Sequence, residues 1–255
     1  MSEFKYLQIR REKAVEYVML NRPEVRNAFN EELITELTAW AAEAGEDAQL
    51  RAVVISGAGA AFCAGGDLTW MSKMATYSYE ENIRDVTGAA RMFAAIDTLP
   101  IPLIARVHGA AMGGGAGLAA VADIVVSEAG AMFGFTEVKL GLLPALIAPY
   151  VLAKIGQSAA RELFLTGRRF TAERALQVGL VHAVVAAGDI DATIQHYIDD
   201  VLGSGREAIA AAKNLIRQIA NKPPDEIVPL TVEALAKQRA SAEAQQRMKA
   251  FLTRK

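Results

Sequence analysis

Apolar residues in the first half of the chain follow two alternating patterns. Short apolar or alternating runs are typical of β-strands, and segments with an apolar residue every three or four positions are typical of one helix face. The predicted strands are residues 4–11, 14–21, 51–57, 101–107 and 123–129. The predicted helices are residues 30–44, 67–74 and 80–99. This alternation predicts an α/β fold in which helices cover a sheet.

After residue 141 the pattern becomes helical, with one short strand at residues 181–185. The predicted helices are residues 145–156, 158–167, 171–179, 190–203 and 206–221, followed by a helical stretch from Pro224 to the end. Together these helices carry more apolar surface than the core of one subunit needs, so we expect the protein to self-associate.

Composition indicates a globular protein and gives no sign of a charged macromolecular partner. Hydrophobic residues make up 52% of the 255 positions and charged residues 22%, so we do not expect the chain to be disordered. A formal net charge of -2 favours neither nucleic acid nor an anionic membrane as partner. No apolar run reaches the roughly 20 residues that span a bilayer, and residues 1–13 lack the apolar stretch of a signal peptide. We therefore expect a cytoplasmic protein.

Cysteine and histidine are scarce, which argues against a disulfide framework and a metal site. Cys63 is the only cysteine, and the three histidines are His108, His182 and His196. None of them stands in an HExxH pattern, and one cysteine cannot build a cysteine-based zinc site. We expect no metal.

The segment HGAAMGGGAGL, residues 108–118, places five glycines between a predicted strand and a small apolar segment. Glycine clusters occur where the backbone takes unusual angles or approaches another group closely. No lysine follows at the spacing of a Walker loop, Leu118 breaks the dinucleotide-binding pattern, and no GxSxG motif is present. The segment is either a tight structural turn or a turn whose backbone N–H groups polarise a substrate oxygen.

A second segment, AFCAGGDL at residues 61–68, also leads from a strand through glycines into a helix. Two such turns could each place one N–H group around a single oxygen, which would make an oxyanion hole. Each turn alone is more often structural. Asp67 is expected to cap the helix that follows.

Six segments, in this order, resemble the crotonase family, also called the enoyl-CoA hydratase/isomerase superfamily. They are residues 20–30, 61–68, 108–123, 133–144, 165–185 and 251–255. The resemblance implies an α/β spiral of β-β-α units at residues 1–195 and a helical C-terminal region at residues 196–255 for oligomerisation. It also implies a homotrimer or homohexamer, an acyl-CoA thioester substrate and a thioester enolate. No cofactor is expected, because CoA is part of the substrate.

The resemblance implies catalytic roles for Gly66, Gly114 and Glu137. The N–H groups of Gly66 and Gly114 would hold the thioester oxygen, and Glu137 would move protons. Typical hydratases of the family carry a second glutamate, but Gly117 stands at that position. A single glutamate is compatible with an enoyl-CoA hydratase or with an isomerase that converts 3-enoyl-CoA into 2-enoyl-CoA. A non-catalytic scaffold with the same fold is a further alternative.

The resemblance also implies a set of CoA-binding residues around the first glycine turn and at the C-terminus. These residues are Arg26, Ala28, Ala64, Asp67, Leu68 and Arg254. For the two arginines a solvated surface charge is the alternative. Residues 66–71 and 142–156 resemble bacterial hydratases that act on branched glutaconyl-CoA thioesters such as 3-methylglutaconyl-CoA.

Overall fold

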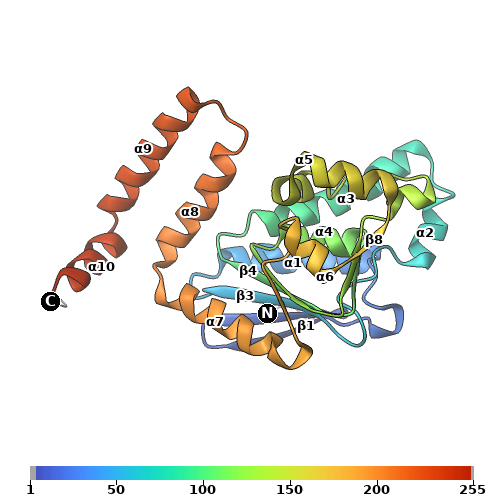
Figure 1. Ribbon diagram of the computed structural model, residues 1–255, viewed down its shortest axis with the longest axis horizontal. Coiled ribbons are helices and arrows are strands. Elements are labelled where there is room, and N and C mark those ends of the chain that lie inside the picture. Colours follow the sequence, from blue (N-terminus) through green and yellow to red (C-terminus); the bar gives the residue numbers. More distant parts are fainter. Residues whose placement is uncertain (1–3, 254–255) are drawn as a thin grey trace.

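The computed structural model describes residues 4–253, and its centre is a six-stranded sheet (Figure 1). The strand order is β1-β2-β3-β4-β6-β9, with an antiparallel β1–β2 pair and parallel pairs beyond it. The bounds are β1 (Leu7–Glu12), β2 (Val15–Leu20), β3 (Ala52–Gly57), β4 (Leu103–Val107), β6 (Ile124–Glu128) and β9 (Ala183–Val185). All six strands occupy predicted segments, so the strand predictions are confirmed.

A second, three-stranded sheet was not predicted from the sequence. Its strands are β5 (Ala110–Met112), β7 (Met132–Gly134) and β8 (Arg169–Thr171), in the order β5-β7-β8. Each strand has three residues, which is too short for an alternating pattern to stand out. This small sheet matters because β5 leads directly into the second glycine turn.

The helices of the main body confirm the periodicity argument, except for α4, which is apolar on all sides. They are α1 (Glu31–Glu46), α2 (Leu68–Met74), α3 (Tyr79–Asp97), α4 (Gly114–Val121), α5 (Ala148–Thr166), α6 (Ala172–Gln177) and α7 (Ile190–Gly203). Short 3-10 helices occur at η1 (Pro23–Val25), η2 (Glu137–Leu140) and η3 (Ala187–Asp189). The two helices predicted at residues 145–156 and 158–167 form one element, α5, which is broken at Gly156 by its positive φ of 67°.

The large sheet is buried on both faces. Val53 and Ile55 of β3 join the cluster that α1 and α3 cover, whereas Ala52 and Val54 join the cluster covered by α7. Continuous apolar strands of this kind are expected in a sheet that has helices on both sides. Figure 1 shows α1 and α3 on one side of the sheet and α7 on the other.

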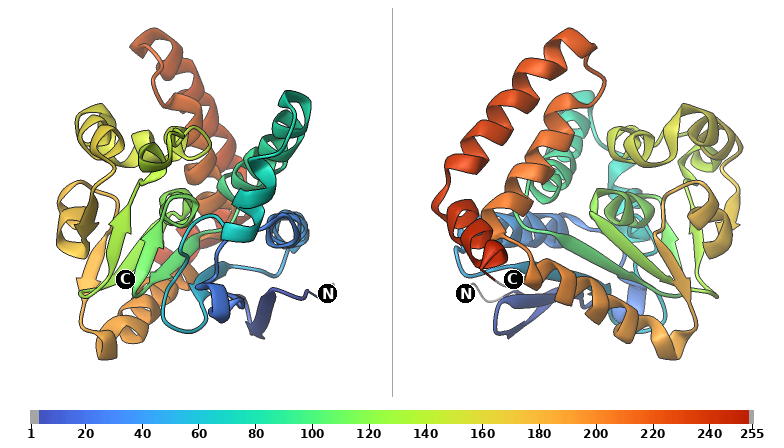
Figure 2. Two further views of the ribbon diagram at one scale, coloured as in Figure 1. Left: turned by 90° about the vertical axis from the view of Figure 1, so that its right-hand side faces the viewer. Right: turned by 60° about the vertical axis from the view of Figure 1, so that its left-hand side comes forward.

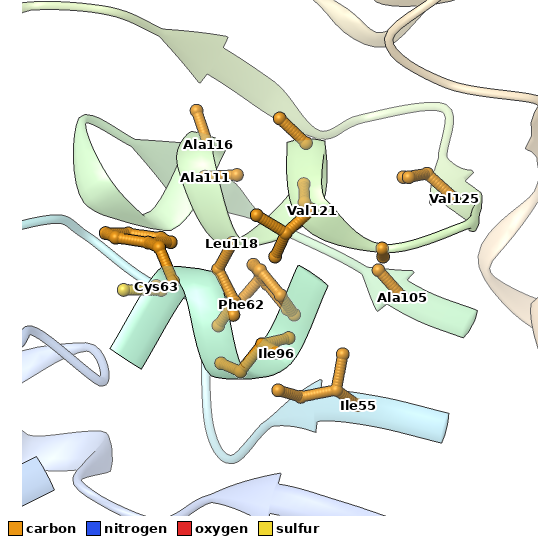
Figure 3. Packing of buried hydrophobic residues seen from close by; sticks show 14 of the residues in the cluster. Ile55, Phe62, Cys63, Ile96, Ala105, Ala111, Ala116, Leu118, Val121 and Val125 are labelled. Carbon is orange, nitrogen blue, oxygen red and sulfur yellow. The ribbon is translucent and has the colours of Figure 1, made fainter. Parts of the chain in front are cut away.

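Helix α4 runs through the interior of the molecule. Seven of its eight residues are buried, which explains why it is apolar all round rather than on one face. Figure 3 shows Leu118 of α4 packed with Phe62 and with Ile96 of α3. The core therefore encloses this helix from its second residue onward.

The last three helices form an arm that leaves the body (Figures 1 and 2). The arm consists of α8 (Arg206–Ile219), α9 (Pro224–Ala240) and α10 (Ala242–Leu252), and none of these helices has a buried residue. A salt bridge of 2.7 Å between Lys213 and Asp123 ties the arm to the body. The predicted boundary at residue 195 falls inside α7, because Ile198 and Val201 still pack against the sheet. An oligomerisation role for the arm stays a prediction.

No helix within residues 4–253 combines the length and the apolar character needed to cross a membrane.

Candidate active site

The two glycine turns lie side by side because a short parallel bridge joins them. Cys63 and Ala111 pair in this bridge, with hydrogen bonds of 3.0 Å from Cys63 N–H to the Ala110 carbonyl and from Met112 N–H to the Cys63 carbonyl. A Cβ atom at Gly65 would lie 3.0 Å from the Met112 carbonyl oxygen. Residues far apart in the sequence thus meet so closely that a side chain at Gly65 would collide with the other turn.

The second turn ends in the first residues of α4. Gly113 has a positive φ of 49° and precedes Gly114, the first residue of the helix. The first N–H groups of a helix have no partner inside it, and the helix dipole adds partial positive charge there. Within residues 4–253, nothing accepts a hydrogen bond from the Gly114 N–H. That N–H group is available to a substrate oxygen.

The first turn presents the N–H group of Gly66 in a similar way. Phe29 bonds to the residues on both sides of Gly66: its N–H donates to the Gly65 carbonyl at 2.7 Å, and its carbonyl accepts from Asp67 N–H at 2.9 Å. The Gly66 N–H itself has no acceptor in the part of the chain that the structure describes. Both predicted oxyanion donors are therefore unpaired.

Glu137 lies at the start of η2 and reaches the second turn. A Cβ atom at Gly113 would be 3.4 Å from Glu137 Oε1 and 4.0 Å from Gly65 Cα. The structure thus brings Glu137 to the place where the two turns meet. Its other oxygen, Oε2, is buried and has no hydrogen-bond partner among the described residues.

Burial raises the pKa of Glu137, and a hydrogen bond from its own backbone offsets part of this effect. A carboxylate away from water and without a partner is less stable in its charged form, which makes it a stronger base when ionised. A raised pKa beside unpaired N–H groups is typical of a group that exchanges protons with a substrate.

Gly117, at the position of the family's other glutamate, has no room for a side chain. A Cβ atom there would lie 2.1 Å from Ile147 Cγ2 and 3.4 Å from Phe93 Cε1. Ile147 is 2% exposed and precedes α5, so it is held in place by the core. Gly117 therefore lets α4 pack closely against Ile147. The second carboxylate is thus replaced by an apolar wall.

Substituting Gly117 by alanine is expected to lower the free energy of unfolding by about 1–3 kcal/mol, the usual cost of overpacking a core. In a double-mutant cycle with Ile147→Ala, the two changes are expected to couple favourably by about 1–2 kcal/mol, because the smaller side chain leaves room for the new methyl group. Urea unfolding of the four proteins measures both quantities.

The matched control is Gly88→Ala in α3, where an added Cβ meets no heavy atom within 4 Å. It is expected to be neutral or stabilising by up to about 1 kcal/mol, because alanine favours a helix over glycine. A Gly117→Ala protein as stable as wild type would show that Ile147 does not fill this space.

The residues predicted to bind CoA surround the first turn, except Arg254, which lies outside the described residues. Arg26 is exposed, and its carbonyl accepts from Ala64 N–H at 2.9 Å. Leu68 is 82% exposed, and Ala28 is buried. A CoA-binding role for these residues stays a prediction. Asp67 is buried, and both of its oxygens already have protein partners.

The sequence analysis gave no role to two buried residues near this turn, Arg22 and Asn27. Arg22 forms a salt bridge of 2.8 Å with Asp67, and both side chains are less than a tenth exposed. Asn27 has a positive φ of 56° and donates to the carbonyls of Ala58 and Ala61, each at 2.8 Å. Both residues lie in residues 20–30, one of the segments that resemble the family, but the resemblance assigned no role to either.

Cys63 and His108 have structural roles in and beside the two turns. Burial raises the pKa of the Cys63 thiol to about 12, so this thiol stays protonated and packs as a small apolar group. His108 Nε2 lies 2.9 Å from the Gly59 carbonyl oxygen, which makes it a donor in this loop. Among residues 4–253, no three His, Cys, Asp or Glu side chains gather closely enough to hold a metal ion.

Comparisons with known proteins agree with this geometry. The family model described as "Enoyl-CoA hydratase/isomerase" matches residues 10–255. A candidate enoyl-CoA hydratase of Thermus thermophilus is 32% identical over 241 residues, 94% of this chain and 95% of that protein. A short-chain-enoyl-CoA hydratase of Clostridium acetobutylicum is 28% identical over 255 residues, 99% of this chain and 97% of that protein.

Solved structures give the same result at the level of the fold. An enoyl-CoA hydratase from Shewanella pealeana matches with a TM-score of 0.95 and 34% sequence identity, over 99% of this chain and 95% of that one. An enoyl-CoA hydratase from Mycobacterium smegmatis matches with a TM-score of 0.93 and 30% identity, over 98% and 97% of the two chains. The expected spiral α/β fold with a helical C-terminal region is thereby confirmed.

Proposed function

Because the chain belongs to the enoyl-CoA hydratase/isomerase family, we propose that it adds water to a 2-enoyl-CoA thioester, with Glu137 as proton carrier. The N–H groups of Gly66 and Gly114 form the oxyanion hole in this proposal. The observation that carries it is the unpartnered, buried Oε2 of Glu137 beside two unpaired N–H groups. A scaffold protein would have no need of this arrangement.

The chemistry needs one carboxylate and one oxyanion hole. The thioester oxygen accepts hydrogen bonds from the two glycine N–H groups. Glu137 takes a proton from water as the water oxygen bonds to Cβ, and the electron pair of the double bond moves onto the thioester as an enolate. The protonated Glu137 then gives its proton to Cα, so water has been added and the carboxylate is restored. Both additions occur on the face of the substrate that Glu137 occupies.

The pH dependence of hydration is expected to reflect the raised pKa of Glu137. The ionised carboxylate accepts the proton of water, so activity declines as pH falls below this pKa and rises as pH passes through it. Burial raises the pKa above its ordinary value of 4.5, which moves the acid limb of kcat/KM to higher pH. The measurement is kcat/KM for crotonyl-CoA between about pH 4 and 8, with circular dichroism at each pH as the folding control. A midpoint at or below the ordinary value would contradict this assignment.

Isomerisation is the second candidate, and the apolar wall at Gly117 and Ile147 favours it. Moving a double bond from the 3- to the 2-position requires one group that carries a proton from Cα to Cγ. The wall stands where a two-glutamate hydratase has its second carboxylate. Proton transfer from Cα to Cγ does not need that carboxylate. Under this alternative Glu137 and the two N–H groups keep their roles, but no water reacts.

Substrate conversion separates these candidates. Crotonyl-CoA and 3-methylglutaconyl-CoA test hydration by loss of the enoyl-thioester absorbance, and a 3-enoyl-CoA tests isomerisation by its gain. We include branched glutaconyl-CoA thioesters because residues 66–71 and 142–156 resemble hydratases that use them. Loss of absorbance with either 2-enoyl thioester supports hydration. A gain with the 3-enoyl thioester alone would reject it in favour of isomerisation.

The proposal includes no separate cofactor, because CoA is part of the substrate. It does include self-association as a homotrimer or homohexamer, which the arm supports. Val228, Val232 and Leu235 recur at helical spacing on α9 and are each more than half exposed, and Phe251 of α10 is 77% exposed. An apolar stripe of this kind on an arm without buried residues is suited to contact with another subunit.

A further inference from the structure

The peptide between Gly65 and Gly66 is oriented by a hydrogen bond on its carbonyl side. The Gly65 carbonyl and the Gly66 N–H belong to one planar, trans peptide, so they point in opposite directions. Phe29 N–H donates to that carbonyl at 2.7 Å, which directs the Gly66 N–H away from Phe29. The direction of this oxyanion donor therefore depends on the position of the Phe29 backbone.

Arg22 holds the backbone on both sides of this contact. Its guanidinium donates from Nη1 to the Ala28 carbonyl and from Nη2 to Asp67 Oδ2, the latter at 2.8 Å. Ala28 precedes Phe29, and Asp67 follows Gly66. One planar group thus links the two segments that pair across the Phe29–Gly66 bridge.

Asp67 completes this link rather than facing a ligand. Its Oδ1 accepts from Thr69 N–H at 2.7 Å and caps α2, while its Oδ2 pairs with Arg22. Burial alone would raise the pKa of Asp67, but the hydrogen bonds from Arg22, Thr69 and Trp70 lower it overall, so the carboxylate stays charged. Both oxygens are committed within the protein.

We propose that Arg22 and Asp67 are a positioning pair that sets the direction of the Gly66 N–H for transition-state stabilisation. This inference rests on the proposed function, since it assigns the pair to the same oxyanion hole. The CoA contact expected at Asp67 involves its backbone, so the side-chain pairing with Arg22 leaves that expectation open. Neither residue touches the reacting atoms; both act through the Phe29 and Gly66 backbone.

Arg22→Lys tests the pair because lysine keeps the charge but cannot bridge two acceptors with a planar fork. The expected result is a loss of about 10- to 100-fold in kcat with KM changed by less than about threefold, since a small misplacement of a catalytic group has effects of this size. The matched control is Arg10→Lys. Arg10 lies over the Tyr17 ring as Arg22 lies over the Tyr6 ring, but it is on β1, the edge strand of the large sheet. The control is expected to retain wild-type kcat.

A spectroscopic readout separates positioning from folding and from turnover. The probe is butyryl-CoA with a ¹³C-labelled thioester carbonyl, which carries no double bond to hydrate. Polarisation by the two N–H groups is expected to lower its infrared carbonyl frequency in wild type, and Arg22→Lys is expected to lose part of that shift. If the wild-type protein polarises butyryl-CoA but does not hydrate crotonyl-CoA, the proposed function is rejected. The carbonyl shift of the Arg22 variant then still tests the positioning pair.

Asp67→Asn is the second variant, because it keeps an oxygen for the helix cap and removes the charge. It is expected to reduce kcat and the carbonyl shift in the same direction as Arg22→Lys. If either folded variant keeps wild-type kcat and the full shift, the pair has no positioning role. Unfolding of both variants would also overturn the proposal, since the pair would then serve the fold alone.

Discussion

Glu137→Gln is expected to lower kcat for crotonyl-CoA hydration by about 10³- to 10⁴-fold. This is the upper part of the range for a positioned acid–base group, because one carboxyl handles both the proton of water and the proton delivered to Cα. Glutamine keeps the shape and cannot exchange protons. The change also removes a buried group whose charged form is disfavoured by burial, so stability is expected to be unchanged or higher. Steady-state kinetics and thermal unfolding measure the two effects.

The matched control is Glu162→Gln on α5. Glu162 is partly exposed and pairs with Arg174 at 2.7 Å and with Arg168 at 3.7 Å. Loss of such a surface pair costs about 0–1 kcal/mol, and kcat is expected to stay at the wild-type value. A Glu137→Gln protein that keeps more than about a tenth of wild-type kcat would remove Glu137 from its proposed role.

Gly114→Val is expected to lower kcat by about 10²- to 10³-fold, the loss seen when one oxyanion donor is removed. A backbone N–H cannot be deleted by substitution, but it can be displaced. A Cβ atom at Gly114 would lie 3.1 and 3.2 Å from two carbons of the Phe29 ring, so a branched side chain must displace that ring or the start of α4. Gly114→Ala is expected to have a smaller effect in the same direction. Steady-state kinetics with crotonyl-CoA gives kcat and KM for each variant.

Gly130→Val is the control for this second experiment. An added Cβ at Gly130 meets no heavy atom within 4 Å, and this residue lies in the turn between β6 and β7. Its kcat is expected to match wild type. If folded Gly114→Val also has wild-type kcat, the Gly114 N–H does not stabilise the transition state.

The larger elements could be predicted from the sequence because each contains enough residues to show its period. Helix α1 repeats its apolar face over 16 residues, and Asn30 caps it by accepting from Leu33 N–H at 2.9 Å, as expected. The three-residue strands β5, β7 and β8 have no comparable pattern. Their pairing depends on chain segments that meet only in the folded protein.

The candidate site was predicted from motif resemblance rather than from periodicity. The positions of Gly66, Gly114 and Glu137 follow from that resemblance, and the structure places them together. The sequence could not show why residue 117 is a glycine. The answer depends on the position in the fold of Ile147, which precedes α5. The Arg22–Asp67 pair was missed for a similar reason, since 45 positions separate the two residues.

The most direct test of a one-glutamate hydratase is mass spectrometry of crotonyl-CoA after incubation with the wild-type protein in ¹⁸O-labelled water. Hydration predicts a product heavier by one labelled water, formed by wild type and lost in Glu137→Gln. Unchanged crotonyl-CoA and 3-methylglutaconyl-CoA, together with a 3-enoyl-CoA that rearranges without a change in mass, would contradict hydration.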